Sequence, residues 1–137
     1  MGRLAEDMSK RSCGPLDGCR ILVAEDNALL LLDIADFLSD AGAEIVGPAV
    51  SVQRAESLAR SEQLDVGVLD VTLKGGDVFP IARILTAKGK GVVFVTGMKD
   101  TSALAREWPK AKVLTKPSLP QDLIQATMAV CPAVTPS

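Results

Sequence analysis

Five short runs of β-branched and aliphatic residues recur along the chain. They occupy residues 21–24, 44–50, 66–69, 92–95 and 112–114. Segments with the 3.6-residue period of an amphipathic helix separate these runs. Strands that alternate with helices predict a parallel sheet, because parallel neighbours need a helical crossover. We therefore predict a doubly wound, five-stranded α/β fold with helices on both faces of the sheet.

The clearest amphipathic helix is predicted over residues 27–41. Its inner face carries Leu31, Ile34, Ala35 and Leu38, and its outer face carries Asp33, Asp36 and Asp40. Asp26 or Asn27 can cap the first turn, because short polar side chains accept hydrogen bonds from the free N–H groups there. We expect the aliphatic face to pack on the sheet.

Four further helices are predicted after the other strands. Ser51 is the predicted N-cap of the second helix, and Pro80 fits only the first turn of the third, since proline has no N–H to donate. The fourth helix is predicted over residues 99–107. The last is expected to begin with Ser118 as its cap and Pro120 in its first turn.

The length of 137 residues suits one domain with its own core and is too short for two. Residues 20–131 carry the repeating pattern and are expected to form this domain. Residues 1–19 have no sustained period, so we expect an N-terminal tail that is partly docked, and residues 132–137 are expected to form a C-terminal tail. We expect no DNA-binding or catalytic domain after Cys131.

Composition and charge remove several classes of function. Aromatic residues make up only 3% of the chain, which leaves few rings for stacking on bases. The net charge of −2 gives no overall attraction to nucleic acid or to an anionic membrane surface. No apolar run approaches the ~20 residues of a membrane-spanning helix. The chain has no His, which excludes His general bases, His-activated nucleophiles and His-ligated zinc. We expect neither nucleic acid nor membrane as a partner.

Three cysteines are present: Cys13, Cys19 and Cys131. They form neither a CxxC pair nor an even set, and no disulfide pairing follows from their spacing. The first residues lack the apolar segment of a signal peptide. A cytoplasmic location, where thiols are kept reduced, is the expectation.

Polar residues follow four of the five predicted strands. Glu25 and Asp26 follow the first, Asp70 the third, Thr96 the fourth and Lys116 the fifth. Each has a structural alternative as a helix cap, a β-forming residue or a solvated cation. The carboxyl ends of parallel strands share one edge of the sheet, however, and ligands bind at that edge. The set therefore predicts a site.

Carboxylates that crowd together repel one another unless a cation is present. With oxygen ligands only, Mg²⁺ or Mn²⁺ is the expected ion, and both are commonly bound together with a phosphate group. Asp70 is the candidate nucleophile that would form an acyl-phosphate. Lys116 would hold the phosphoryl oxygens and Thr96 would donate a hydrogen bond to them. We expect Lys116 to form at most a surface ion pair, so its loss should barely change stability.

Four motifs carry a family resemblance in the order ILVAEDN, VLDVTLKGG, VVFVTG and LTKP. With these motifs, residues 20–131 resemble the CheY-like receiver domain of two-component response regulators, of the stand-alone type. The sequence VFVTG also resembles that of a subgroup of receivers that work with sensor kinases of alphaproteobacterial type.

The resemblance implies the strand order 2-1-3-4-5. It implies Mg²⁺ held by Glu25, Asp26, Asp70 and the backbone carbonyl of Thr72. A sensor histidine kinase or phosphotransfer protein would transfer its phosphoryl group to Asp70, with Thr96 as the switch residue. Such a protein is not an enzyme in the usual sense, since it catalyses only its own phosphoryl transfer and slow dephosphorylation. It would signal by docking onto a downstream protein, and a homodimer is possible.

Two positions depart from the family pattern. Val113 stands where an aromatic switch residue is common, so the output face is expected to signal differently. Ser118 stands where Phe is usual, so the last helix loses an apolar anchor. Thr72 and Met98 occupy the positions that resemble a gate for the hydrolytic water, and Met98 offers that water no useful donor.

Two alternatives remain open. A haloacid-dehalogenase-type phosphatase also forms an aspartyl-phosphate at a strand end, but it needs a second Asp two residues later, where this chain has Thr72. A degenerate receiver would keep the fold and act as an unphosphorylated interaction module. A P-loop nucleotide site is excluded, because GxxxxGK[ST] is absent.

Overall fold

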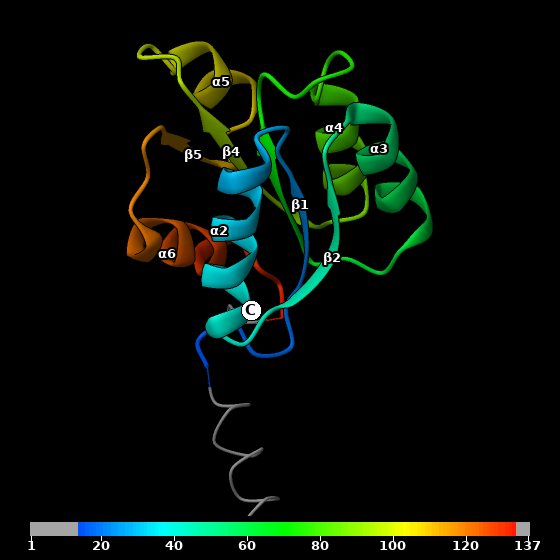
Figure 1. The fold of residues 1–137 in the computed structure, drawn as a ribbon. Coiled ribbons are helices and arrows are strands. Elements are labelled where there is room, and N and C mark those ends of the chain that lie inside the picture. The colour runs from blue at the N-terminus through cyan, green and yellow to red at the C-terminus, as the bar shows by residue number, and fades with distance from the viewer. Residues whose placement is uncertain (1–13, 134–137) are drawn as a thin grey trace, which may run out of the picture.

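The structure is a computed structural model that describes residues 14–133. Its centre is one parallel sheet with the strand order β2-β1-β3-β4-β5 (Figure 1). The strands are β1 (Arg20–Ala24), β2 (Glu44–Ala49), β3 (Val66–Asp70), β4 (Gly91–Thr96) and β5 (Lys112–Thr115). The predicted fold class and strand order are confirmed.

Five described helices cover the two faces of the sheet. They are α2 (Ala28–Asp40), α3 (Val52–Ser61), α4 (Phe79–Ala87), α5 (Ser102–Glu107) and α6 (Pro120–Val130). Helices α2 and α6 lie on one face, and α3 and α4 lie on the other (Figure 1). Among the described residues, no helix has the length and apolar character needed to cross a membrane.

Two apolar clusters, one on each face, form the core. The alternation in β1 shows how the sheet divides them: Ile21 and Val23 face α2 and α6, whereas Leu22 and Ala24 face α3 and α4. Successive side chains of a strand point to opposite faces, so an uninterrupted apolar run fills both clusters. Leu31, Ile34 and Leu38 are the buried residues of α2, as its amphipathic pattern predicts.

Most of the few aromatic residues lie on the α4–α5 side. Phe94 in β4 meets Phe79 edge to face at a centroid distance of 5.8 Å and Trp108 at 5.6 Å. Such pairs contribute beyond the area that they bury. They fix the short helix α5 to the sheet, since Leu104 is its only buried residue.

Local hydrogen bonds explain where the helices begin. The side chains of Asn27 and Ser51 accept N–H bonds as N-caps of α2 and α3, and Pro80 lies in the first turn of α4, all as predicted. Helix α5 begins at Ser102, later than predicted, because Asp100 binds the N–H and hydroxyl of that residue in a turn.

The predicted cap of the last helix was wrong. The Ser118 hydroxyl donates to the Thr115 carbonyl at 3.2 Å, and Leu119 occupies the N-cap position without a side-chain hydrogen bond. Pro120 begins α6 as expected. The rigid ring of Pro120 at N1 thus starts the helix where no polar cap is present.

The segment before β1 packs into the core. Leu16 and Cys19 are fully buried, and the N–H of Leu16 donates to the Ala41 carbonyl at the end of α2 at 2.8 Å. Cys19 is joined to Cys131 by a disulfide that the spacing of the cysteines did not predict. The other parts of the predicted tails, residues 1–13 with Cys13 and residues 134–137, lie outside the described residues.

Candidate functional site

The carboxyl ends of β1, β3, β4 and β5 bring the predicted polar residues to one edge of the sheet. Backbone pairing continues just past these ends: the N–H of Glu25 donates to Ala49, that of Val71 to Val95, and that of Lys116 to Thr96, at 2.8 to 3.0 Å. The sheet therefore fixes the backbone from which the site residues project.

Two of the acids are almost completely buried. Glu25 is 1% exposed and Asp70 is 2% exposed. One oxygen of each is held by its own loop, because the N–H of Asn27 donates to Glu25 Oε2 at 3.1 Å and the N–H and hydroxyl of Thr72 donate to Asp70 Oδ1 at 3.0 and 3.1 Å. In both cases the donor lies two residues after the acid, and for Asp70 this is the local turn that aspartate side chains favour.

The other oxygen of each buried acid faces Lys116. The Nζ atom lies 3.2 Å from Asp70 Oδ2 and 3.3 Å from Glu25 Oε1. The Lys116 side chain is 28% exposed but both partners are 2% exposed, so the expectation of a surface ion pair was wrong. Removal of this cation would leave two buried carboxylates without their neutralising partner.

The acids Glu25, Asp26 and Asp70 each offer a carboxylate oxygen, and these oxygens lie within 4.8 Å of one another. Asp26 is exposed, so the cluster opens to solvent on its side. Glu25 Oε1 is buried without a hydrogen bond, although it contacts Lys116. A buried acceptor that lacks a donor and is surrounded by carboxylates suits a hard divalent cation.

The two buried acids differ in their acidity. Burial is the main reason that the pKa of Glu25 is raised above its ordinary value, and the neighbouring Asp70 adds to this effect. Burial would also raise the pKa of Asp70, but the Thr72 N–H, the contact with Glu25 and the charge of Lys116 together lower it. Asp70 is therefore the acid that stays ionised, and Glu25 takes up a proton first.

The Lys116 amine is correspondingly stabilised in its charged form. Burial alone would lower its pKa, but the charge and hydrogen bond of Asp70 and the charge of Glu25 raise it above the ordinary value. A permanent positive charge therefore stands beside Asp70 at neutral pH.

Thr96 and Thr72 differ in their burial and in their hydrogen bonds. Thr96 is fully buried at the end of β4, and its hydroxyl oxygen accepts the Met98 N–H at 3.0 Å. Its hydroxyl proton is thus available to a further acceptor. Thr72 is exposed and donates to Asp70 through both its N–H and its hydroxyl, and the role predicted for its carbonyl stays a prediction.

Sequence reasoning missed Asn27 as a part of the site. Its side chain caps α2 while its N–H holds Glu25, so one residue links the start of the helix to the acid cluster. The signal was an acid two residues before a helix N-cap, the same i, i+2 spacing that relates Asp70 to Thr72.

Comparison with known proteins agrees with this geometry. The chain is 34% identical over 110 residues to the transcriptional regulatory protein PdtaR of Mycobacterium tuberculosis, covering 78% of this chain and 54% of that protein. A crystal structure of a response regulator receiver protein from Sinorhizobium medicae superimposes with a TM-score of 0.72 at 27% identity, covering 82% of this chain and 93% of that one. The chain contains a response-regulator receiver domain.

A third similarity is to a sensor protein. Over 80 residues the receiver domain is 32% identical to the sensor protein TorS of Escherichia coli, covering 58% of this chain and 9% of that protein. The chain spans about half the length of PdtaR, although the match to PdtaR covers most of the residues of this chain. No family model matches the chain.

The two departures from the receiver pattern have structural counterparts. Val113 is half-buried and packs against the apolar cluster on the α3–α4 face, so the position of the missing aromatic switch is filled by a short aliphatic side chain. Ser118 binds back to Thr115 within the loop that follows β5. Neither residue carries a ring that could move between inward and outward orientations.

Proposed function

We propose that this receiver domain accepts a phosphoryl group on Asp70 from the phosphohistidine of a sensor histidine kinase or a phosphotransfer protein. The observation that carries the proposal is the buried Asp70 carboxylate, which faces the Lys116 ammonium at 3.2 Å and lies in the acid cluster with Glu25 and Asp26. The absence of His from the chain fits a reaction in which the imidazole belongs to the partner.

The reaction begins with an ionised carboxylate. The lowered pKa of Asp70 keeps it negative at neutral pH, so one of its oxygens can attack phosphorus in line with the leaving imidazole. A P–O bond forms as the P–N bond of the donor breaks, and the imidazole nitrogen takes the electron pair. Lys116 and the Thr96 hydroxyl then hold the phosphoryl oxygens through a positive charge and a hydrogen bond.

The acid cluster fits the Mg²⁺ or Mn²⁺ that the receiver fold implies. Glu25, Asp26 and Asp70 would hold the ion with the Thr72 carbonyl, and Glu25 Oε1 is the buried oxygen that lacks a hydrogen bond. A bound divalent cation would offset the negative charge of the carboxylates and of the phosphoryl oxygens.

The phosphodonor protein must approach the edge of the sheet where Asp70 lies. Helix α2 begins at this edge, one residue after Asn27, and its outer surface exposes Leu29 by 78% and Leu32 by 57%. Two large apolar side chains so exposed beside a reaction site favour burial by a protein partner. We place the donor's contact on this part of α2.

Protein docking also accounts for the output. We propose a signalling protein without an enzymatic product, which docks onto a downstream target and loses its phosphoryl group slowly by its own chemistry. The cytoplasm is the proposed compartment, since the ATP that charges a histidine kinase is found there.

Intact mass after incubation with acetyl phosphate and MgCl₂ tests the phosphorylation. The wild-type chain should gain the mass of one phosphoryl group, and Asp70→Asn should gain none. Asp36→Asn, on the outer surface of α2, is the matched control and should behave as wild type. A phosphorylated Asp70→Asn protein, or an unmodified wild type, contradicts the proposal.

The same experiment decides between the proposal and its alternatives. A degenerate receiver would remain unmodified although it keeps the fold, and the assembled acid cluster is the observation against it. A haloacid-dehalogenase-type phosphatase is disfavoured, because Thr72 replaces its second Asp and the similar structures are receivers.

Docking on α2 is tested separately from the chemistry. Leu29→Ser and Leu32→Ser should slow transfer from a phosphorylated histidine kinase by about tenfold or more, the loss of one buried Leu contact. Their modification by acetyl phosphate should be unchanged. Val50→Ser, an exposed apolar residue after β2, is the control. Normal transfer to both Leu variants would place the donor elsewhere.

A further inference from the structure

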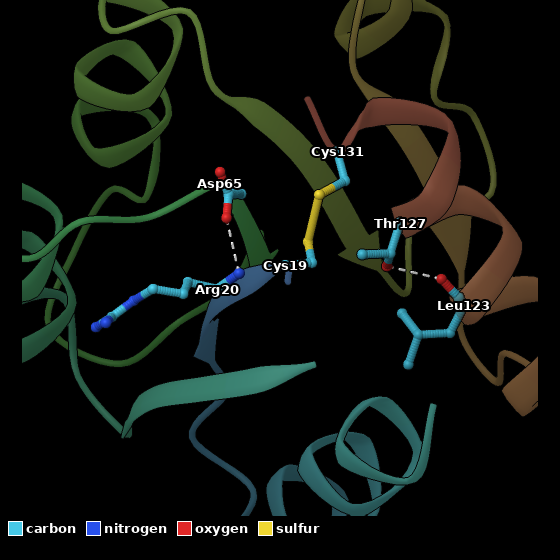
Figure 2. The surroundings of a disulfide bond; sticks show 6 residues. All are labelled: Cys19, Arg20, Asp65, Leu123, Thr127 and Cys131. Carbon is cyan, nitrogen blue, oxygen red and sulfur yellow. Dashed lines mark hydrogen bonds between the residues drawn. A yellow bond between two sulfur atoms is a disulfide. The ribbon is translucent and has the colours of Figure 1, made fainter. Parts of the chain in front are cut away.

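A disulfide connects the two ends of the described chain. Cys19 directly precedes β1, Cys131 is the C-cap residue of α6, and the two are 112 residues apart in sequence (Figure 2). Starts of strands and ends of the helices that follow them lie at the same edge of a parallel α/β sheet. The bond therefore lies at the edge opposite to Asp70 and takes no part in the acid cluster.

Both cysteines are fully buried in the apolar cluster beneath α2 and α6. Reduced cysteines behave as small apolar side chains and would remain packed there. The backbone of Cys19 is also held without the disulfide, because its carbonyl accepts the Glu44 N–H at 2.9 Å and its N–H donates to the Leu16 carbonyl at 3.0 Å. The fold can thus exist with the two sulfurs joined or apart.

The two sulfurs differ in how they can be reached. Cys19 lies between the N-terminal turn and the sheet, whereas Cys131 ends α6 and is followed by the exposed residues Pro132 and Ala133. Helix ends open at a lower free energy than a central strand does. Opening the last turn of α6 would expose Cys131 Sγ and leave the sheet intact.

We propose that Cys19 and Cys131 form a reversible redox site that exchanges with low-molecular-weight disulfides of the glutathione type. In oxidation, the Cys131 thiolate attacks the small disulfide, forms a mixed disulfide and releases one thiol. Cys19 then attacks Cys131 Sγ, the internal bond forms, and a second thiol leaves. One external disulfide is thereby reduced to two thiols, and two protein thiols lose their protons.

Asp65 sets the rate of this exchange. Its carboxylate lies with the two sulfurs in a group whose ligand atoms are within 4.8 Å of one another, and its Oδ2 accepts the Arg20 N–H at 2.9 Å. The Arg20 side chain points away from the sulfurs (Figure 2). A carboxylate opposes the negative charge of a thiolate beside it, so Asp65 slows the exchange.

The consequence of oxidation is a change in stability. A cross-link across 112 residues restricts the unfolded chain over almost the whole domain, and the loop-closure model assigns a large stabilisation to loops of this length. Oxidation should raise the thermal midpoint by roughly 10 to 20 °C. The redox state of its surroundings would thus set how long this domain survives unfolding and proteolysis.

The test uses the full chain with Cys13→Ser as background, so that two cysteines remain. The protein is equilibrated in glutathione buffers of graded oxidised-to-reduced ratio, its free thiols are alkylated, and its mass and thermal midpoint are measured. We expect a conversion from two free thiols to none, with the rise in midpoint given above. Cys131→Ser in the same background should show no dependence of its midpoint on the buffer.

Two further variants test the order and rate of the steps. With Cys19→Ser, glutathione should be trapped on Cys131 as a mixed disulfide, whereas Cys131→Ser should trap little on Cys19. Asp65→Asn, which keeps an acceptor for the Arg20 N–H, should exchange several-fold faster. Equal trapping on both cysteines would overturn the assigned order, and an unchanged rate would overturn the role of Asp65.

Three outcomes would overturn the redox proposal itself: thiols that stay free in oxidised glutathione, a disulfide that is reduced only in denaturant, or a stoichiometric Zn²⁺ on the reduced cysteines and Asp65 in native mass spectrometry. Modification of Asp70 by acetyl phosphate should be the same in both redox forms. Because the thiol and midpoint measurements do not involve Asp70, failure of the phosphorylation proposal would leave their result unaffected.

Discussion

Lys116 reaches Asp70 from the far side of an intervening strand. The two residues are 46 positions apart, Asp70 ends β3, and Lys116 follows β5, while β4 lies between these strands. The Lys116 N–H is tied to the Thr96 carbonyl of β4 at 2.8 Å, and its ammonium nevertheless lies 3.2 Å from Asp70 Oδ2. The ion pair thus links three strands at the edge that carries the site.

Lys116→Ala should destabilise the metal-free protein by about 1 to 3 kcal/mol at neutral pH. The reason is that Asp70 and Glu25 stay buried without their cation, and the lower figure allows for the partly exposed Lys116. Lys110→Ala, an exposed lysine, is the control for urea denaturation. A free energy of unfolding equal to that of wild type would show that the acids find another partner or become neutral at no cost.

Glu25→Gln should stabilise the metal-free protein at neutral pH. The folded-state pKa of Glu25 is raised above its ordinary value of 4.5, so the folded state binds this proton more tightly than the unfolded state does. That contribution to stability is complete below the ordinary pKa and is lost as the pH rises through the folded-state pKa. The advantage of the E25Q variant over wild type should therefore shrink as the pH falls towards 4.5.

Thermal melts of E25Q and wild type between about pH 4.5 and 8, in the presence of a chelator, measure this difference. Asp70 works in the opposite direction, since its lowered pKa gives stability that is lost as the pH falls below its ordinary value of 3.8. The range above pH 4.5 therefore separates the two acids. A variant that is less stable than wild type throughout would contradict the assigned sign.

Asp26→Ala should weaken Mg²⁺ binding by about 1 to 3 kcal/mol, the usual range for loss of a charge-assisted contact. Asp26 is the exposed member of the acid cluster, so its removal should leave stability without metal unchanged. Isothermal titration calorimetry with MgCl₂ measures the first effect and a chelated melt the second. Unaltered affinity would remove Asp26 from the ligand set.

Met98→Glu and Met98→Lys should each speed loss of the phosphoryl group several-fold. Met98 lies two residues after Thr96, its side chain is 45% exposed, and its backbone N–H is tied to the Thr96 hydroxyl. A polar side chain at this place can orient the attacking water, which a thioether cannot. Decay of the phosphorylated mass measures the rate. Leu119→Glu, an exposed apolar residue after β5, is the control, and equal rates in all four proteins would exclude Met98 as the gate.

The strands and the shared edge of the site were predictable because they follow from simple periodicities. The strand centres fall where the β-branched runs place them, since a strand buried on both faces has few polar positions. Asn27 and Ser51 cap their helices for the reason that the sequence suggests. Once the sheet is parallel, the acids and Lys116 must meet at one edge.

The features that were missed depend on which atoms a loop brings together. The Ser118 hydroxyl can cap a helix or bind back to Thr115, and the sequence alone does not choose between these bonds. The burial of Asp70, which makes its partner Lys116 more than a surface charge, depends on packing. The Cys19–Cys131 disulfide could have been predicted from the topology, because a residue before the first strand and one after the last helix lie at the same edge of the sheet.

The backbone bonds that continue past the strand ends divide this molecule into a fixed reaction centre and replaceable surroundings. Residues 74–77 and 97–100 lie just beyond the reactive side chains and are exposed, whereas Val71 and Lys116 are still anchored to neighbouring strands. Insertions or exchanges in those loops can therefore alter which protein is recognised without moving Asp70. Such a design allows a new signalling connection to be built by grafting loops, with the phosphoacceptor left untouched.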